Sequence, residues 1–396
     1  MSSERPDGFD EISHLRPVPP KDSDLPPLRS RPEGKTKPEP AFGFWMAVLW
    51  CVLYLIVTQF LALIFCGIPI IFVFMAIEVA NNGQGMLNDP AKQKEWVQGD
   101  DGRLMMLTVL IASHLVGVLF GWIMIRWRIG RQWKRRMALT RWPSITHWVL
   151  ILIGFPALLG VSSAVEQPIM KYVPSVQDLL NRANIDFEWP GIEAVEPLLK
   201  KTPFLLAFFA VAILPAVNEE FWCRGFLGRG LAGRYPMWAV MLMTSFLFGA
   251  IHLEPRQGLW AMFFGAAIYA TYVATRSLWA AMFIHFVNNG LAVLHSSDQI
   301  GWPLLQPISD LLERSPLEFV SASSLLLAAV GYALYQTRCK LISPDDGLVW
   351  EPPGVSSVEL PPPGSGTIVT HDPLSPLSVS LVVVGAVAFG LVLTFA

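Results

Sequence analysis

Long runs of apolar residues alternate with short polar connections along most of this chain. A helix needs about 20 apolar residues to cross the hydrocarbon core of a bilayer, and several runs approach that length. These runs cover residues 42–66, 104–125, 147–164, 203–222, 237–253, 258–275, 278–295, 318–337 and 377–396. The pattern predicts an all-α fold, a polytopic transmembrane helical bundle of about eight or nine spans.

The composition supports a membrane protein. Of the 396 residues, 53% are hydrophobic and 15% are charged, whereas a soluble domain carries about a quarter of charged residues. The 29 basic and 31 acidic residues nearly cancel, so we expect the lipid bilayer and no nucleic acid as a partner. The four cysteines lack the CxxC spacing of a zinc or redox site.

Proline-rich stretches divide the chain. Residues 1–41 are polar and contain few large apolar side chains, which predicts a disordered cytoplasmic tail. The helical bundle follows at 42–340. Residues 341–375 are again rich in proline and are typical of a linker, which leads to a C-terminal transmembrane helix at 376–396.

Basic residues gather in the loops of one side. All these loops are cytoplasmic if the N-terminus is cytoplasmic, as the positive-inside rule requires. We therefore expect an integral, multi-pass protein in this orientation, in a bacterial inner membrane. The residues concerned are Arg126, Arg128, Arg131, Lys134, Arg135, Arg136, Arg141, Arg224, Arg229, Arg234, Arg276, Arg338 and Lys340.

Ionisable residues within the apolar runs concentrate in one third of the chain. Such groups are costly in hydrocarbon, so each is a candidate functional residue. The fourth run ends in NEEFWCRG, the fifth in FGAIHLE, and the seventh contains IHFVNNG. The candidates are Glu219, Glu220, Arg224, Phe248, His252, His285 and Asn289. His114 and His295 are assigned to helix packing and to a helix end.

Helical spacing sorts these candidates. Glu220 and Arg224 are four residues apart and stack on one face, which favours an ion pair. Glu219 points about 100° away from Glu220 around the helix axis, so it is less well placed for Arg224 and is free to act as a base. His285 and Asn289 share a face.

This set permits hydrolysis. A carboxylate and an imidazole can position a water molecule and accept its proton, and a second imidazole with an amide can donate to an oxyanion. No serine or cysteine has a histidine at motif spacing, and there is no HExxH sequence. A Zn²⁺ site formed by Glu219, His252 and His285 is stereochemically open, although the spacing does not specify it. The sequence thus specifies no cofactor and leaves Zn²⁺ open.

Three motifs in this order resemble the CAAX-protease and bacteriocin-processing family of intramembrane proteases, called CPBP or Abi. They are EExxxR (Glu219, Glu220, Arg224), FxxxH (Phe248, His252) and HxxxN (His285, Asn289), and the similarity covers about residues 200–295.

The resemblance implies an intramembrane endopeptidase of the CAAX prenyl protease 2 type. Its substrates would be membrane-associated proteins or peptides, of the prenylated CAAX type or peptide toxins. Glu219 would be the general base, helped by His252, and His285 with Asn289 would stabilise the oxyanion. Glu220, Arg224 and Phe248 would support the site. The family is labelled a metalloprotease family, yet a metal-free glutamate mechanism fits the same residues and is preferred.

Helix geometry sets a condition on this site. If the fifth span begins near Met237, His252 lies about 22 Å along its axis, whereas Glu219 lies only about 8 Å above Arg224. They could then meet only if residues 225–240 run partly inside the bundle or if the fifth helix tilts strongly.

Other classes of function stay open. A non-catalytic immunity or partner-binding protein could keep the motifs for structure. A proton-coupled transporter could use the same buried groups, although it would usually contain inverted repeats, and none is evident in the sequence.

Overall fold

The computed structural model describes residues 41–86, 88–187, 199, 202–296, 306–342, 358–361 and 366–395. Residues 1–40 of the predicted tail, and much of the predicted linker, lie outside these ranges. The helices of the described part are α1 (Phe44–Leu55), α2 (Ile68–Asn82), α3 (Pro90–Gln98), α4 (Asp100–Arg128), α5 (Trp133–Arg136), α6 (Ile145–Tyr172), α7 (Val176–Arg182), α9 (Phe204–Phe208), α10 (Leu214–Glu220), α11 (Gly228–Ala232), α12 (Met237–Ala250), α13 (Pro255–Thr275), α14 (Leu278–Ser296), α15 (Gln306–Arg314), α16 (Pro316–Gln336) and α17 (Pro376–Phe395).

Eight of the described helical segments are long and apolar enough to cross a membrane, and Met237–Ala250 is a shorter apolar helix. The predicted all-α bundle of eight or nine spans is therefore confirmed. The first and fourth segments each combine several helical elements. The first is continuously helical over Phe44–Asn82 and the fourth over Phe204–Ala232, because π-helical turns join their α-helical parts.

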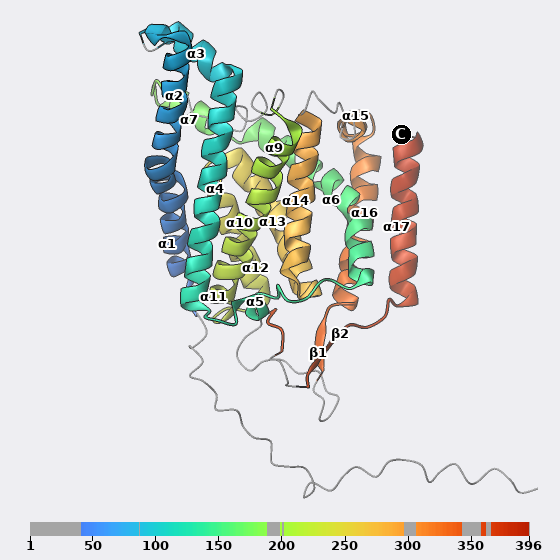
Figure 1. Ribbon diagram of the computed structural model, residues 1–396. Coiled ribbons are helices and arrows are strands. Elements are labelled where there is room, and N and C mark those ends of the chain that lie inside the picture. Colours follow the sequence, from blue (N-terminus) through green and yellow to red (C-terminus); the bar gives the residue numbers. More distant parts are fainter. Residues whose placement is uncertain are drawn as a thin grey trace, which may run out of the picture. The chain divides into compact units, whose positions relative to one another are not determined.

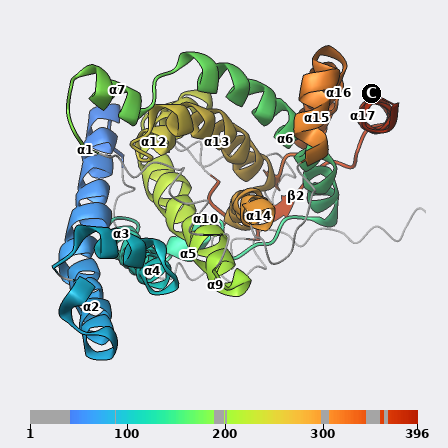
Figure 2. The same cartoon turned by 90° about the horizontal axis from the view of Figure 1, so that it is seen from above.

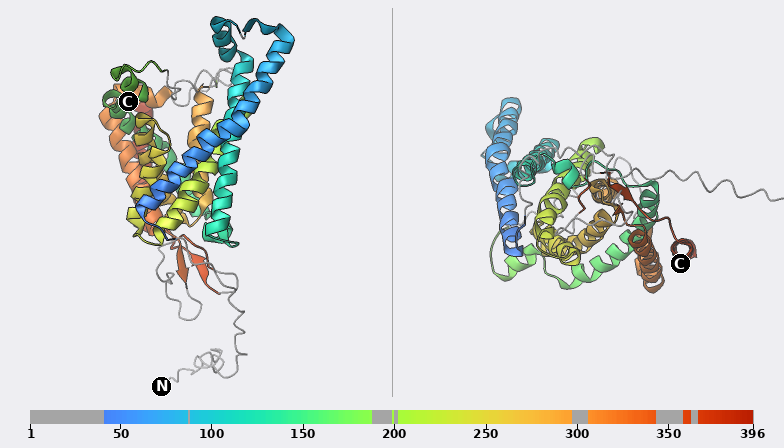
Figure 3. Two further views of the ribbon diagram at one scale, coloured as in Figure 1. Left: turned by 90° about the vertical axis from the view of Figure 1, so that its left-hand side faces the viewer. Right: turned by 90° about the horizontal axis from the view of Figure 1, so that it is seen from below.

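The helices form two packed groups (Figures 1 and 2). In one, α10–α14 pack together with α4, and α1 with α2 crosses α4 at a wide angle (Figure 3). In the other, α16 packs against α6 on one side and α17 on the other. Contacts of α6 with α13 and α14 join the two groups.

The main hydrophobic core surrounds the helix that begins at Phe204. Trp222 is fully buried, and its ring stacks on Tyr54 and on Phe226, with ring centroids 4.7 and 4.8 Å apart. Aromatic pairs in this arrangement add to the gain from burial alone. The fourth helix is thus fixed against α1 on the side away from α13.

Part of the predicted linker is docked on the bundle. Strands β1 (Lys340–Ile342) and β2 (Ile368–Thr370) pair antiparallel. Between them, Val358 and Leu360 are buried, and the carboxylate of Glu359 lies 2.6 Å from Nη2 of Arg135 and 2.9 Å from Nη2 of Arg229. Composition gave no sign of these contacts, because one acidic residue between prolines meets cations supplied by distant helices.

The basic elements lie at one end of the bundle. The C-terminal end of α4, then α5 and α11, lie at the same end as the start of α1 and the two strands (Figure 1). This arrangement is consistent with the common side expected for the basic loops.

Candidate active site

The two adjacent acids lie in the middle of the fourth helix. They end the seven-residue helix α10, which is flanked by the π-helical segments η5 (Phe209–Ile213) and η6 (Phe221–Leu227). Such π-helical turns are rare and frequently occur at functional sites.

The extension of this helix to Ala232 removes the geometric conflict. Glu219 lies about 20 Å from the end of its helix at Ala232, and His252 lies about 22 Å from Met237, where the next helix begins. The predicted end of the span at residue 222 is wrong. The first of the two expected conditions is met, because residues 225–232 continue the helix inside the bundle and are all buried. Gly225 lies close to Met137, since a Cβ there would overlap with the terminal methyl group of that side chain.

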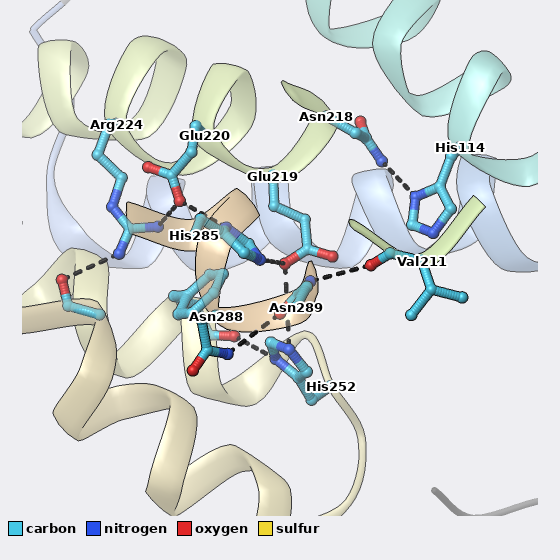
Figure 4. Close-up of polar contacts among 12 residues, drawn as sticks. His114, Val211, Asn218, Glu219, Glu220, Arg224, His252, His285, Asn288 and Asn289 are labelled. Atoms are coloured by element: carbon cyan, nitrogen blue, oxygen red, sulfur yellow. Dashed lines mark hydrogen bonds and ion pairs between the residues drawn. The ribbon is translucent and has the colours of Figure 1, made fainter. Parts of the chain in front are cut away.

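Glu219 faces both histidines. Its Oε2 atom lies 4.0 Å from Nε2 of His252 and 3.9 Å from Nε2 of His285 (Figure 4). This oxygen is buried, and it has no hydrogen-bond partner among the described residues. A separation of this length is too great for a direct hydrogen bond and is typical of groups that share a bridging molecule.

The position of the proton on each imidazole ring follows from the hydrogen-bond partner of its Nδ1 atom. Nδ1 of His252 lies 2.8 Å from the carbonyl oxygen of Phe248, and Nδ1 of His285 lies 2.9 Å from Oε1 of Glu220. A carbonyl and a carboxylate only accept, so both Nδ1 atoms donate. In a neutral ring, each Nε2 then presents a lone pair toward Glu219.

Glu220 makes the ion pair that spacing favoured. Its Oε1 atom accepts from Nη1 of Arg224 at 2.7 Å as well as from His285. Arg224 also donates to the carbonyl oxygen of Gly265 at 2.9 Å. Both members of the pair are excluded from solvent. The ion pair therefore links the fourth helix to α14 through Glu220 and to α13 through Arg224.

Phe248 packs at the centre of these groups. Its ring lies 5.1 Å from the ring of His252 and 5.7 Å from that of His285, both edge-on. The guanidinium carbon of Arg224 lies 4.5 Å from its centroid, within the range of a cation–π interaction. Phe248 therefore contacts both imidazoles and the buried cation, rather than His252 alone.

Asn289 is held by the backbone of the fourth helix. Its Nδ2 atom donates to the carbonyl oxygen of Val211 at 3.1 Å, and its Oδ1 accepts from Asn288 at 3.2 Å. Pro215 has no N–H to donate to Val211 four residues before it, so the amide replaces a missing helical donor. The second N–H of Asn289 remains for another acceptor.

A cavity of about 450 Å³ reaches these groups. Glu219 and His252 lie on its wall, together with three residues that sequence reasoning missed or assigned to packing, namely Tyr54, His114 and Asn218. A histidine within an apolar span was itself a usable signal, but His114 has no neighbouring motif.

The donor atoms at this site are of types that bind a metal ion, but their positions do not suit one. Among the described residues, no group of three or more His, Cys, Asp and Glu side chains is arranged to hold a metal ion. Two ligands about 2.1 Å from a tetrahedral Zn²⁺ lie about 3.4 Å apart, and the pairs formed by Glu219 with His252 and His285 are wider.

These features define an integral, multi-pass membrane protein whose buried carboxylate and imidazoles open onto a cavity. Residues 201–291 match the family model described as Rce1-like, type II CAAX prenyl endopeptidase Rce1-like. This match supports the CAAX-protease family that the motifs resembled and a CAAX-type intramembrane endopeptidase in general. Comparison with curated proteins and with solved structures finds no match to the chain.

Proposed function

We propose that this protein hydrolyses peptide bonds in membrane-associated polypeptides, with prenylated CAAX-type C-termini as the expected substrates and peptide toxins as the other class. Glu219 is the general base of a metal-free mechanism. The observation that carries the proposal is the buried, unbonded Oε2 of Glu219 between two Nε2 atoms, at the wall of a cavity.

In the first step, Glu219 and Nε2 of His252 accept the two hydrogens of a water molecule. Glu219 takes one proton as the water oxygen attacks the carbonyl carbon. The resulting oxyanion needs donors. The spare N–H of Asn289 is one. The other is Nε2–H of His285, in the form of the enzyme whose ring has taken up one proton from solvent before the substrate binds and keeps that proton throughout the cycle.

Glu220 makes the second donor available. Since its carboxylate lies 2.9 Å from Nδ1 of His285, it stabilises the cationic ring. In the second step, the bond between carbon and nitrogen breaks, and the proton held by Glu219 passes to the departing amine. The carboxyl group and the regenerated Glu219 carboxylate complete the cycle.

The test is cleavage by the purified protein in liposomes. The panel contains peptides that end in a farnesylated cysteine followed by three residues, and membrane-embedded helices. A general base contributes about 10²- to 10⁴-fold, so Glu219→Gln should lower kcat by that factor. Glu318→Gln is the matched control, because Glu318 is exposed in the first turn of α16.

A chelator arm tests the metal. Cleavage that persists in the chelator supports the glutamate mechanism, and cleavage lost in the chelator but restored by Zn²⁺ contradicts it. A folded wild type that cleaves nothing in the panel would favour a non-catalytic, partner-binding protein.

A further inference from the structure

The cavity beside Glu219 has a second polar wall. Helix α4 contributes His114, and α10 contributes Asn218, the residue directly before Glu219. His114 and Asn218 lie on the side of Glu219 opposite to His252 and His285 (Figure 4). The proposed mechanism uses neither of them.

The amide of Asn218 is held in a fixed position. The residue is 2% exposed, and its Nδ2 atom donates to the hydroxyl oxygen of Tyr54 at 2.8 Å. The same atom lies 3.3 Å from Nδ1 of His114. Gly117 leaves space for the amide, because a Cβ there would lie 2.6 Å from both Nδ2 and Oδ1.

This arrangement fixes the tautomer of His114. Asn218 uses its two N–H groups for Tyr54 and for Nδ1 of His114, so Nδ1 accepts and the ring proton is on Nε2. No hydrogen-bond partner for that Nε2 is found in the part of the chain that the structure describes, and His114 lies on the cavity wall. An N–H donor is thus presented next to a catalytic carboxylate.

The hydroxyls of Thr58 and Ser113, which also line the cavity, do not offer the same chemistry. Thr58 donates to the carbonyl oxygen of Tyr54 at 2.8 Å, and Ser113 donates to that of Thr58 at 2.5 Å. Both protons are used within the protein, so each hydroxyl offers only an acceptor to a ligand.

We propose that His114 is a substrate-binding residue whose Nε2–H donates to a backbone carbonyl oxygen of the substrate polypeptide, next to the bond attacked at Glu219. Asn218 is the positioning residue that sets the His114 tautomer. This inference rests on the proposed function, because it places the substrate in the same cavity.

Two variants separate the two ring nitrogens. His114→Asn keeps an acceptor near the position of Nδ1 and removes the donor at Nε2, whereas His114→Gln places an amide N–H near Nε2. Loss of one neutral hydrogen bond costs about 2- to 12-fold in binding. We expect His114→Asn to raise KM by that factor with kcat within about twofold, the pattern of a lost contact made equally in ground and transition states. His114→Gln should recover most of the loss.

The controls are His295→Asn and His295→Gln, since His295 is exposed near the end of α14. A second measurement does not depend on cleavage. Binding of a fluorescent farnesyl-cysteine peptide to Glu219→Gln protein is followed by anisotropy, with and without His114→Asn. The same weakening, about 2- to 12-fold, is expected.

The outcomes distinguish the two proposals. A wild type that binds the peptide but cleaves nothing contradicts the hydrolytic mechanism, while weaker binding in His114→Asn still supports the contact. Unchanged binding and unchanged KM in a folded His114→Asn protein would overturn the inference and leave hydrolysis intact. A fall in kcat alone would also overturn the inference about His114. Absence of peptide binding would contradict both this inference and the proposed function.

Discussion

Replacing Glu220 by glutamine removes a charge from the most enclosed part of the site with little change of shape. Oε1 of Glu220 lies 2.7 Å from Nη1 of Arg224 and 2.9 Å from Nδ1 of His285, and neither member of the ion pair is exposed to solvent by more than 1%. Removing one partner of a buried pair costs about 3–5 kcal/mol, because the remaining charge loses its compensation. We expect the free energy of unfolding to fall by about that amount.

A double-mutant cycle tests the physical reason. Unfolding in mixed micelles is measured for Glu220→Gln, Arg224→Met and the double variant, with Glu318→Gln as the control for an exposed acid. Groups in direct contact couple by about 0.5–3 kcal/mol, and burial places this pair near the upper limit. Arg224 keeps its bond to Gly265 and its contact with Phe248, so the loss should not exceed the upper estimate.

Two results would refute this reasoning. One is a Glu220→Gln protein whose unfolding free energy is within about 1 kcal/mol of wild type, which is below the range for a broken buried pair. The other is simple addition of the two single effects, which would mean that the groups do not compensate each other.

Three further predictions concern other parts of the fold. A Cβ at Gly249 would collide with a backbone carbonyl oxygen of α13, so Gly249→Ala should destabilise the protein by about 1–3 kcal/mol in thermal unfolding, whereas Gly331→Ala, with no atom near its Cβ, should not. Glu359→Gln should leave the buried Arg229 poorly compensated and expose the docked segment to limited proteolysis; an unchanged digestion pattern would contradict this. Burial raises the pKa of the Cys339 thiol. In a single-cysteine variant, the rate of alkylation of Cys339 should therefore still rise about tenfold per pH unit at pH values where the rate for an ordinary thiol no longer changes. A plateau of this rate near pH 9 would contradict the prediction.

The sequence predicted the class of fold well, because a membrane span depends on the composition of its own segment. Apolar runs of about 20 residues need no knowledge of their neighbours. The fourth span shows the limit of this approach. Its run ended at residue 222, but the helix continues to Ala232, since Arg224 and Arg229 are compensated by Glu220 and Glu359. The partner of Arg224 lies one turn away in the same helix, whereas the partner of Arg229 comes from a distant segment that local composition does not reveal.

The candidate site was partly predictable for a similar reason. The pairing of Glu220 with Arg224 follows from helical spacing, whereas the approach of His285 to the same oxygen depends on packing of α14 against α10. The neighbours of His114 could not be predicted, because they come from α1 and α10. Without knowledge of these neighbours, His114 was interpreted as a helix-packing residue.

The position of the ion pair within a single helix also bears on biogenesis. Because Glu220 and Arg224 are four residues apart, they can neutralise each other as soon as their helix forms, before any other span arrives. Each charge alone would add about 2.5–3.5 kcal/mol to the cost of membrane insertion. Early neutralisation lowers this cost for the segment that must carry Glu219 into the bilayer. His285, 65 residues after Glu220 in the chain, joins only when α14 has been inserted, so the proposed catalytic arrangement is completed late in assembly.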